Sequence, residues 1–145
     1  MSDIPLILLN LEDDGYHLLV DVFIFNQSFR AVLDTGASKT VFDKATIEKY
    51  IDPELLMSSD KLSTGLGTNT MTSHTLIIPD LQMGDLHLKN YELAILDLSA
   101  INFAYEQLSH EPVIGVIGGD LLYKYQAVID YKKMILQLNL KSDRY

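Results

Sequence analysis

One acidic residue of this chain stands between an apolar stretch and a tight turn. Val32 and Leu33 precede Asp34, and Thr35-Gly36-Ala37-Ser38 follow it. A carboxylate at the edge of a hydrophobic core can hold a water molecule and exchange a proton with it. The residue types around Asp34 therefore suit acid–base chemistry. The alternative is an ordinary turn, in which the Asp side chain accepts hydrogen bonds from its own backbone.

Hydrolysis of an amide needs a base to deprotonate water and an acid to protonate the carbonyl oxygen. Two adjacent carboxylates meet both needs, because their like charges push the two pKa values apart and leave one proton shared. We expect Gly36 to offer an N–H group to Asp34, the Thr35 hydroxyl to pin the loop from below, and the Ser38 hydroxyl to donate to the outer oxygen of Asp34. The chain has one Asp-Thr-Gly, so the second carboxylate must come from a second copy across a two-fold axis.

The stretch Val32–Ser38 resembles the active-site loop of the aspartic peptidases, in which two apolar residues precede Asp-Thr-Gly and Ala or Ser follows. A second element, Val116-Ile117-Gly118, resembles the family's later apolar-apolar-glycine motif, which runs beneath the catalytic loop and leads into a short helix. Val113-Ile114-Gly115 offers a competing register. We favour the later one, because Asp120-Leu121-Leu122-Tyr123 predicts a helical turn directly after it, capped by Asp120.

A third element, the glycine-containing tip Gly65-Leu66-Gly67, stands where the family has a flap that closes over substrate; an ordinary surface loop is the alternative. From about Tyr16 to Leu140, the order of motifs is similar to that of a retropepsin-like aspartic peptidase domain, the half-sized type that works as a homodimer. Two features depart from the smallest retropepsins. The interval between the two motifs is longer, and Gly119-Asp120 replaces the basic residue that often follows the second motif.

The resemblance implies a mostly-β fold, a closed barrel of the retropepsin-like acid protease type with one or two short helices, spanning residues 1–145 as a single domain. It implies an aspartic endopeptidase that acts on peptides or proteins, in which Asp34 of each protomer of a homodimer activates water without a cofactor. A non-catalytic peptide-binding or dimerisation module with the same fold is the alternative. The apolar segments Ile4–Leu9 and Ile135–Leu140 form a sheet shared between protomers in this hypothesis, or else pair within one chain.

The surrounding elements should place Asp34 at the end of a strand. Tyr16–Phe25 and Phe29–Leu33 are rich in apolar and β-branched residues and predict a hairpin around a turn at Asn26-Gln27-Ser28. Asp43 is expected to cap a short helix over Lys44–Tyr50. The remaining pattern predicts a strand through Leu76-Ile77-Ile78 that ends at Pro79-Asp80, a turn at Met83-Gly84-Asp85, a strand over Tyr91–Leu96, a helix or an ordered loop over Ser99–Glu111, and a last hairpin of Ala127–Tyr131 and Met134–Leu140.

Composition excludes several other classes. The chain has 20 acidic and 11 basic residues, a net charge of −9, and no long Lys/Arg run, so we expect neither nucleic-acid binding nor docking on an anionic membrane. It has no cysteine, and its four histidines lack metal-ligand spacing. A Ser38-based triad has no Gly-x-Ser-x-Gly elbow to support it. The N-terminus lacks the basic flank of a secretory signal, so a cytoplasmic location is expected.

Overall fold

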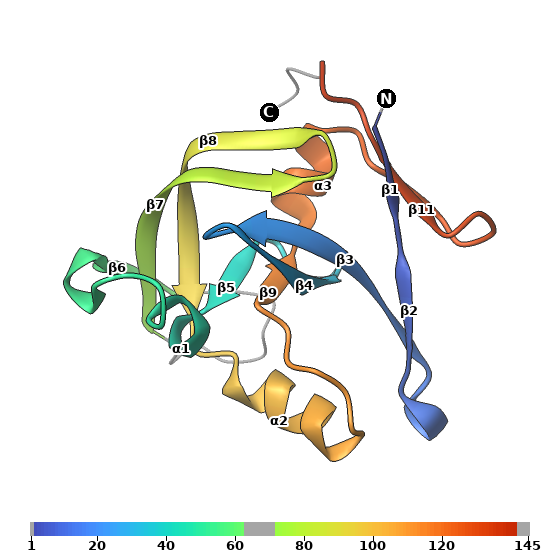
Figure 1. Cartoon of the computed structure of the whole chain (residues 1–145), viewed down its shortest axis with the longest axis horizontal. Helices are drawn as coiled ribbons and strands as arrows, with labels where there is room; N and C mark the ends of the chain where they lie inside the picture. Colours follow the sequence, from blue (N-terminus) through green and yellow to red (C-terminus); the bar gives the residue numbers. More distant parts are fainter. Residues whose placement is uncertain (1, 63–71, 142–145) are drawn as a thin grey trace.

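The computed structural model describes residues 2–62 and 72–141 and consists mainly of short strands (Figure 1). The described part of the chain has three α-helices rather than the one or two expected, and the mostly-β architecture is confirmed. The strands are β1 (Ser2–Pro5), β2 (Ile7–Asn10), β3 (Tyr16–Ile24), β4 (Gln27–Leu33), β5 (Val41–Asp43), β6 (Met57–Leu62), β7 (Thr72–Met83), β8 (Leu86–Leu96), β9 (Gly115–Ile117), β10 (Val128–Asp130) and β11 (Ile135–Leu138). The helices are α1 (Lys44–Ile47), α2 (Ser99–Gln107) and α3 (Gly119–Lys124), and the 3-10 turns are η1 (Glu12–Asp14) and η2 (Pro53–Leu55).

Six of the described strands close into a barrel. Their order is β3-β4-β9-β5-β8-β7, and the pairing of Phe23 with Gln82 joins β7 back to β3. Side chains alternate along β3, where Val20 and Val22 are buried while Asp21 and Phe23 are exposed. Such alternation is what a strand with one face on a core requires.

Strand β9 brings distant parts of the chain together in this barrel. It runs parallel to β4 on one side and antiparallel to β5 on the other. The approach to β5 is close, because a Cβ on Gly115 would lie 2.4 Å from Cδ1 of Phe42. Only glycine fits there, so β4, β9 and β5 can lie side by side and present their ends at one edge of the barrel.

Two apolar clusters lie on opposite faces of these central strands. The larger one fills the barrel and includes Leu33, Phe42 and Ile117. The smaller one includes their sequence neighbours Val32 and Val116, and it is covered by α2. Because the residues of β4 and β9 alternate between the two clusters, both faces of these strands are buried. The loop that follows β4 is therefore held on a rigid support.

The terminal segments pair within one chain. Strand β11 lies between β1 and β10, with Ile4 opposite Leu136 and Ile129 also opposite Leu136. Figure 1 shows β1 and β11 beside each other, next to the barrel. Of the two arrangements left open for Ile4–Leu9 and Ile135–Leu140, the structure has the intrachain one. Both edges of β11 are occupied, so a second copy could extend this sheet only at β1 or β10.

The hairpin and the first helix are confirmed with different bounds. The turn between β3 and β4 is formed by Phe25 and Asn26, whose φ values of 55° and 60° give the left-handed conformation of a tight two-residue hairpin turn. Strand β4 therefore begins at Gln27, inside the turn that was expected. Asp43 caps α1 by accepting a hydrogen bond from the Thr46 N–H at 3.2 Å, but the helix ends at Ile47 rather than at Tyr50.

The expected break at Pro79 is wrong, because β7 continues through it to Met83. Ile78 faces Tyr91 and Asp80 faces Lys89 without a change of register. Pro79 therefore stands at the level of Asn90, whose φ is 49°. A proline is tolerated in a strand where its missing N–H is not needed for the ladder, as at a bend. Figure 1 shows β7 and β8 bending together.

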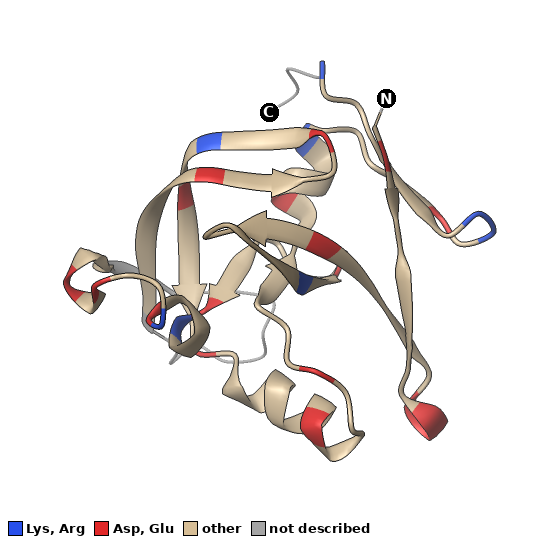
Figure 2. Cartoon of the chain, viewed as in Figure 1, with Lys and Arg blue, Asp and Glu red and all other residues tan. Residues whose placement is uncertain are grey.

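The other expected elements are present. The turn between β7 and β8 contains Gly84, with a φ of 57°, and the last hairpin is formed by the short strands β10 and β11. The segment left open between a helix and a loop contains α2. Figure 2 shows the basic residues of the described segments on separate elements rather than in one patch. Within those segments, no helix combines the length and the apolar character needed to cross a membrane.

Candidate active site

Asp34 follows the last residue of β4 and lies at the open edge of the barrel. Its N–H donates to the Ile117 carbonyl at 3.0 Å, so the backbone of Asp34 is tied to the end of β9. Its side chain is half-buried, and Oδ1 accepts a hydrogen bond from the Gly36 N–H at 2.9 Å. The Ala37 N–H donates to the Asp34 carbonyl at 3.2 Å and closes the turn. The carboxylate is thus oriented by its own loop and remains open to solvent on one side.

The second glycine motif lies directly against this loop. Val116 and Ile117 pair with the last two residues of β4, and Gly118 follows them. A Cβ on Gly118 would lie 2.6 Å from the Lys39 carbonyl oxygen, so a side chain there would collide with backbone. The residues that contact the loop are therefore those of the later register, 116–118, rather than those of the register 113–115.

The link between the loop and the second motif depends on Thr40, which the sequence analysis did not single out. Thr40 is buried, and its hydroxyl donates to Asp120 Oδ1 at 2.8 Å while accepting from the Gly118 N–H at 3.0 Å. The Thr40 N–H also donates to Asp120 Oδ1, at 2.9 Å. One threonine thus joins both sides of the site.

Asp120 has a different role from the one expected. The N-cap of α3 is Gly118, which makes no side-chain cap hydrogen bond, and Asp120 lies inside the first turn. Its Oδ1 accepts hydrogen bonds from Thr40 and from the Leu121 N–H at 2.8 Å. The expected cap by Asp120 is wrong, because the nearby N–H groups of the loop compete for the same carboxylate. Asp120 is a structural link between α3 and the loop.

The other predicted loop residues lie around Asp34. The Thr35 side chain is exposed and makes no hydrogen bond to a described residue, so the hydroxyl that holds the loop from below is that of Thr40. Ala37 is buried, and its carbonyl accepts from the Gly119 N–H at 2.8 Å. Ser38 is exposed, and its carbonyl accepts from the Asp120 N–H. The predicted flap residues Gly65, Leu66 and Gly67 lie outside the described residues.

A tyrosine of α2 also lies near the site, and sequence reasoning missed it. Tyr105 is buried in the small apolar cluster together with Ala37, and its hydroxyl lies 2.6 Å from Nδ1 of His17. Burial, and then the negative charge of Asp34, raise the pKa of Tyr105 to about 12. The phenol is therefore neutral at physiological pH.

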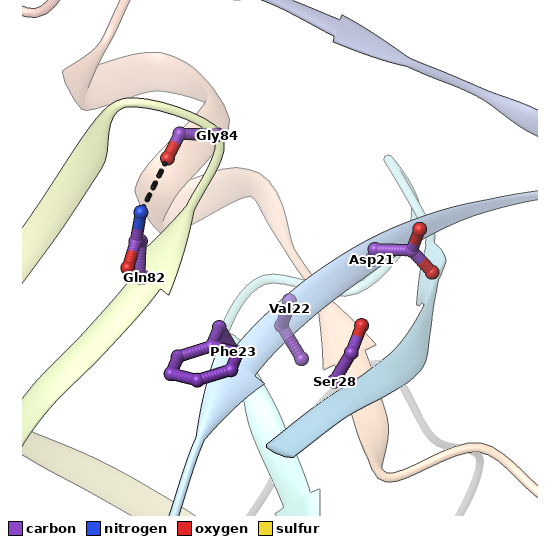
Figure 3. Close-up of a pocket in the computed structure, with 6 residues that line it drawn as sticks. All are labelled: Asp21, Val22, Phe23, Ser28, Gln82 and Gly84. Atoms are coloured by element: carbon purple, nitrogen blue, oxygen red, sulfur yellow. Dashed lines mark hydrogen bonds between the residues drawn. The ribbon is translucent and has the colours of Figure 1, made fainter. Parts of the chain in front are cut away.

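Two of the hollows on the described chain differ in their distance from the Asp34 loop. One of about 330 Å³ is lined by Thr35, Gly119, Tyr123 and neighbouring residues, beside the Asp34 loop. Another, of about 360 Å³, lies between the β3–β4 hairpin and the β7–β8 turn (Figure 3). It contacts Ser28, which lies six residues before Asp34 along β4, a distance of about 20 Å in a strand. It is therefore not part of the candidate site.

Nothing in the described residues resembles a metal site, since no three His, Asp or Glu side chains come together there. The site offers one carboxylate, held by a rigid loop and partly open to solvent. One such group can act as a base or as an acid. Amide hydrolysis by the shared-proton route requires a second carboxylate facing it.

Comparison with known proteins agrees with this geometry. A family model described as aspartyl protease matches residues 20–121, a span that contains both the Asp34 loop and the second glycine motif. The structure is similar to the retroviral protease-like domain of Ddi1 from Leishmania major (TM-score 0.59, 16% identity, 87% of this chain and 90% of that one). It is also similar to a retropepsin-like aspartic protease from Rickettsia conorii (TM-score 0.55, 21% identity, 93% of this chain and 92% of that one). No curated protein matches the sequence. The prediction of a closed barrel of the retropepsin-like type is confirmed.

Proposed function

Because the chain belongs to the aspartyl protease family, we propose that it is an aspartic endopeptidase whose active form is a homodimer. Asp34 of each protomer supplies one carboxylate of the catalytic pair. The substrate is an extended peptide or protein segment, and the reaction uses no cofactor. The absence of nucleic-acid and membrane partners and the cytoplasmic location remain predictions from the sequence.

The observation that carries this proposal is the way in which the Asp34 carboxylate is held. Oδ1 is fixed by the Gly36 N–H at 2.9 Å, and the loop is joined to β9 and α3 through Thr40. A fixed, half-exposed carboxylate is what general acid–base catalysis requires.

A second copy can supply the missing carboxylate across a two-fold axis. The surface beside Asp34 contains the exposed Thr35 and the exposed ring of Tyr123, which line one hollow with Gly119. In an isologous interface the same patch meets itself, so a contact over this face would bring the two Asp34 loops together. Within the described residues, β1 and β10 each have one edge that pairs with no strand of the terminal sheet, so a second copy could add a strand there.

The pair would hydrolyse an amide with one shared proton. The ionised carboxylate takes a proton from water while the water oxygen forms a bond to the carbonyl carbon. The neutral carboxyl group gives its proton to the carbonyl oxygen, which produces a tetrahedral diol. The carboxyl group that took the proton from water then gives it to the amide nitrogen as the C–N bond breaks, while the other, ionised carboxylate takes a proton from a diol hydroxyl. A carboxylic acid and an amine are released, and the pair again holds one proton. The predicted flap at Gly65–Gly67 would close over the peptide during these steps.

The test compares the wild-type chain with Asp34→Asn on a diverse peptide library from acidic to neutral pH. We expect cleavage by the wild type and a loss of at least about a hundredfold in Asp34→Asn, because the amide cannot act as a base. Sedimentation, with and without a peptidomimetic inhibitor, measures the dimer directly. Equal cleavage by both proteins, or a monomer under every condition in which cleavage occurs, would contradict the proposal.

A further inference from the structure

Tyr105 lies in the apolar surroundings of Asp34, on the side of the loop that α2 covers. The tyrosine is 3% exposed and shares an apolar cluster with Val32, which precedes Asp34 by two residues, and with Ala37, which follows it by three. Val116 of the second glycine motif belongs to the same cluster. Burial, and then the negative charge of Asp34, raise the pKa of the Tyr105 phenol to about 12, so the ring lies within electrostatic range of the carboxylate.

The described residues bound the Asp34 loop on three sides. Leu33 faces the barrel interior, which is filled by apolar side chains. The exposed residues Thr35 and Tyr123 lie on a second side, where the second protomer is proposed to bind. The third side is the one that Tyr105 covers. Because protein fills the other two sides, we expect an extended peptide that crosses the catalytic pair to run over the third.

The two residues that flank the cleaved bond have little freedom of position. Successive residues of an extended peptide are about 3.3 Å apart, and their side chains point alternately to opposite faces. With the scissile carbonyl at the catalytic pair, each flanking side chain lies about one residue length from Asp34. It must therefore pack on the side chains that surround the carboxylate, which on this side are Val32, Ala37 and Val116.

The Tyr105 ring already covers these side chains. Val32, Ala37 and Val116 are 7%, 4% and 1% exposed, so little of their surface is left to contact a substrate. Protein interiors are close-packed, and a bulky group inserted into a filled site forces its neighbours out of place. Glycine, alanine or serine adds little volume next to the bond. Leucine or phenylalanine would need the room that the tyrosine ring takes.

Helix α2 is fixed to the rest of the chain near both of its ends. At its start, the Leu98 N–H donates to Asp43 Oδ1 at 3.0 Å. Farther along, the Asn102 side chain bridges to the backbone that leads into β9, since it accepts from the Val113 N–H at 2.8 Å and donates to the Val113 carbonyl at 3.1 Å. The helix is therefore a fixed wall beside the Asp34 loop.

The Tyr105 ring is held from the opposite side by the β2–β3 hairpin. Its hydroxyl oxygen lies 2.6 Å from Nδ1 of His17, on β3. His110, just after α2, meets the ring edge-on, and its Nε2 lies 2.9 Å from the Asn10 carbonyl oxygen of β2. With these contacts on one side and the apolar cluster on the other, the ring has a single position next to the loop.

We propose that Tyr105 is a specificity-determining residue, which restricts the two residues that flank the scissile bond to small ones such as glycine, alanine and serine. This inference rests on the proposed function and adds a substrate class to it. In the homodimer each protomer contributes one Tyr105, and the two-fold axis places one on each side of the bond. The restriction therefore applies to both flanking positions.

The first experiment needs only the wild-type chain. A diverse peptide library is cleaved, the cleavage sites are mapped by mass spectrometry, and matched peptides that differ only in the two flanking residues are then compared. We expect kcat/KM to be about ten- to a hundredfold higher for alanine or serine at these positions than for leucine or phenylalanine, because overfilling a close-packed site carries a penalty of this size. Equal or preferential cleavage beside leucine or phenylalanine would overturn the inference.

The second experiment removes the ring. Tyr105→Ala leaves a space beside the loop, so the ratio of kcat/KM for the leucine peptide to that for the alanine peptide should rise at least about tenfold. Tyr105→Phe is the matched control, because it keeps the ring in the apolar cluster and loses only the hydroxyl, and it should retain the wild-type ratio. Tyr105→Leu, which removes part of the ring, replaces Tyr105→Ala if that variant does not fold. A folded ring-deleted variant with the wild-type ratio would contradict the inference.

Asp34→Asn distinguishes failure of this inference from failure of the proposed function. If no peptide is cleaved faster by the wild type than by Asp34→Asn, the proposed function fails, and this inference fails with it. If cleavage depends on Asp34 but occurs beside large apolar residues, the proposed function stands and only the role assigned to Tyr105 is wrong.

Discussion

Thr40→Val is the substitution that most sharply tests how the Asp34 loop is supported. Valine has nearly the shape of threonine, so the change removes the hydroxyl and leaves the packing of this buried site almost unaltered. Two hydrogen bonds are lost, one to Asp120 Oδ1 at 2.8 Å and one from the Gly118 N–H at 3.0 Å. The Gly118 N–H is then buried without a partner.

The size of the effect follows from these two losses. A buried N–H left unpaired costs about 1–3 kcal/mol, and a hydrogen bond to a carboxylate contributes about 1.5–3 kcal/mol. Asp120 retains the N–H groups of Thr40 and Leu121, which moderates the second loss. We therefore expect a decrease of about 3 kcal/mol in the free energy of unfolding. For a chain of this size, that lowers Tm by about 10 °C.

Urea and thermal unfolding of the two proteins measure the change. Thr35→Val is the matched control, because it removes the same hydroxyl from an exposed residue of the same loop that makes no hydrogen bond to a described residue. All proteins are compared as monomers at low concentration, because Thr35 also lies on the face proposed for the dimer contact. We expect Thr35→Val to stay within about 0.5 kcal/mol of the wild type. The reasoning is refuted if Thr40→Val is as stable as Thr35→Val, or if the control is the more damaged of the two.

Three further predictions concern stability. Gly118→Ala should lower the free energy of unfolding by about 3 kcal/mol or prevent folding, because its Cβ would lie 2.6 Å from the Lys39 carbonyl oxygen. In the control Gly119→Ala the nearest atom is 3.5 Å away, so the change should be less than about 1 kcal/mol. Chemical denaturation measures both values. Between pH 10 and 12 Tyr105 ionises in the unfolded chain but stays neutral in the folded one, because its pKa in the folded chain is raised to about 12. The free energy of unfolding should therefore fall over this range by about 2 kcal/mol more in the wild type than in Tyr105→Phe. An equal pH dependence of the unfolding free energy in the two proteins would contradict this. Asp43→Ala removes the carboxylate that accepts hydrogen bonds from the buried Leu98 N–H, at 3.0 Å, and from the first turn of α1. We expect it to lower the free energy of unfolding by more than about 1 kcal/mol. A smaller decrease in thermal unfolding would argue against the Leu98–Asp43 hydrogen bond.

Features that depend on neighbouring residues could be predicted from the sequence. The hairpin of β3 and β4 follows from its runs of β-branched and aromatic residues, and Asp43 caps α1 because an Asp before a helical pattern has N–H groups within reach. Asp34 lies at a strand end for the same local reason. The predicted bounds of the two strands were less accurate. The two-residue turn at Phe25 and Asn26 needs left-handed φ values, and the sequence Phe-Asn-Gln-Ser has no glycine that would indicate them.

Features that depend on distant residues could not be predicted in this way. The hydrogen bond between Thr40 and Asp120 joins residues 80 positions apart, and Asp120 does not form the cap that its place before Leu121-Leu122-Tyr123 suggested. The contact of Tyr105 with His17 spans 88 positions. Neither of these two contacts could be predicted from the sequence, because they depend on the pairing of β4 with β9 and on the packing of α2 against the barrel.

Proline gave a misleading local signal for a related reason. Pro79 suggested a chain break because proline donates no hydrogen bond to a sheet. In the barrel, β7 and β8 bend at this level, and the residue facing Pro79 has a left-handed φ, so the missing donor costs little. A strand that curves around a barrel can accept a residue that a flat central strand would not.

The measurement that tests the central claim most directly mixes wild-type chains with Asp34→Asn chains at constant total concentration, after dissociation and reassembly. If each catalytic centre needs Asp34 from both protomers, activity falls with the square of the wild-type fraction, and an equal mixture retains about one quarter of the full activity. If each chain works alone, the equal mixture retains about one half. We predict the quadratic curve, and a straight line would contradict the shared catalytic pair.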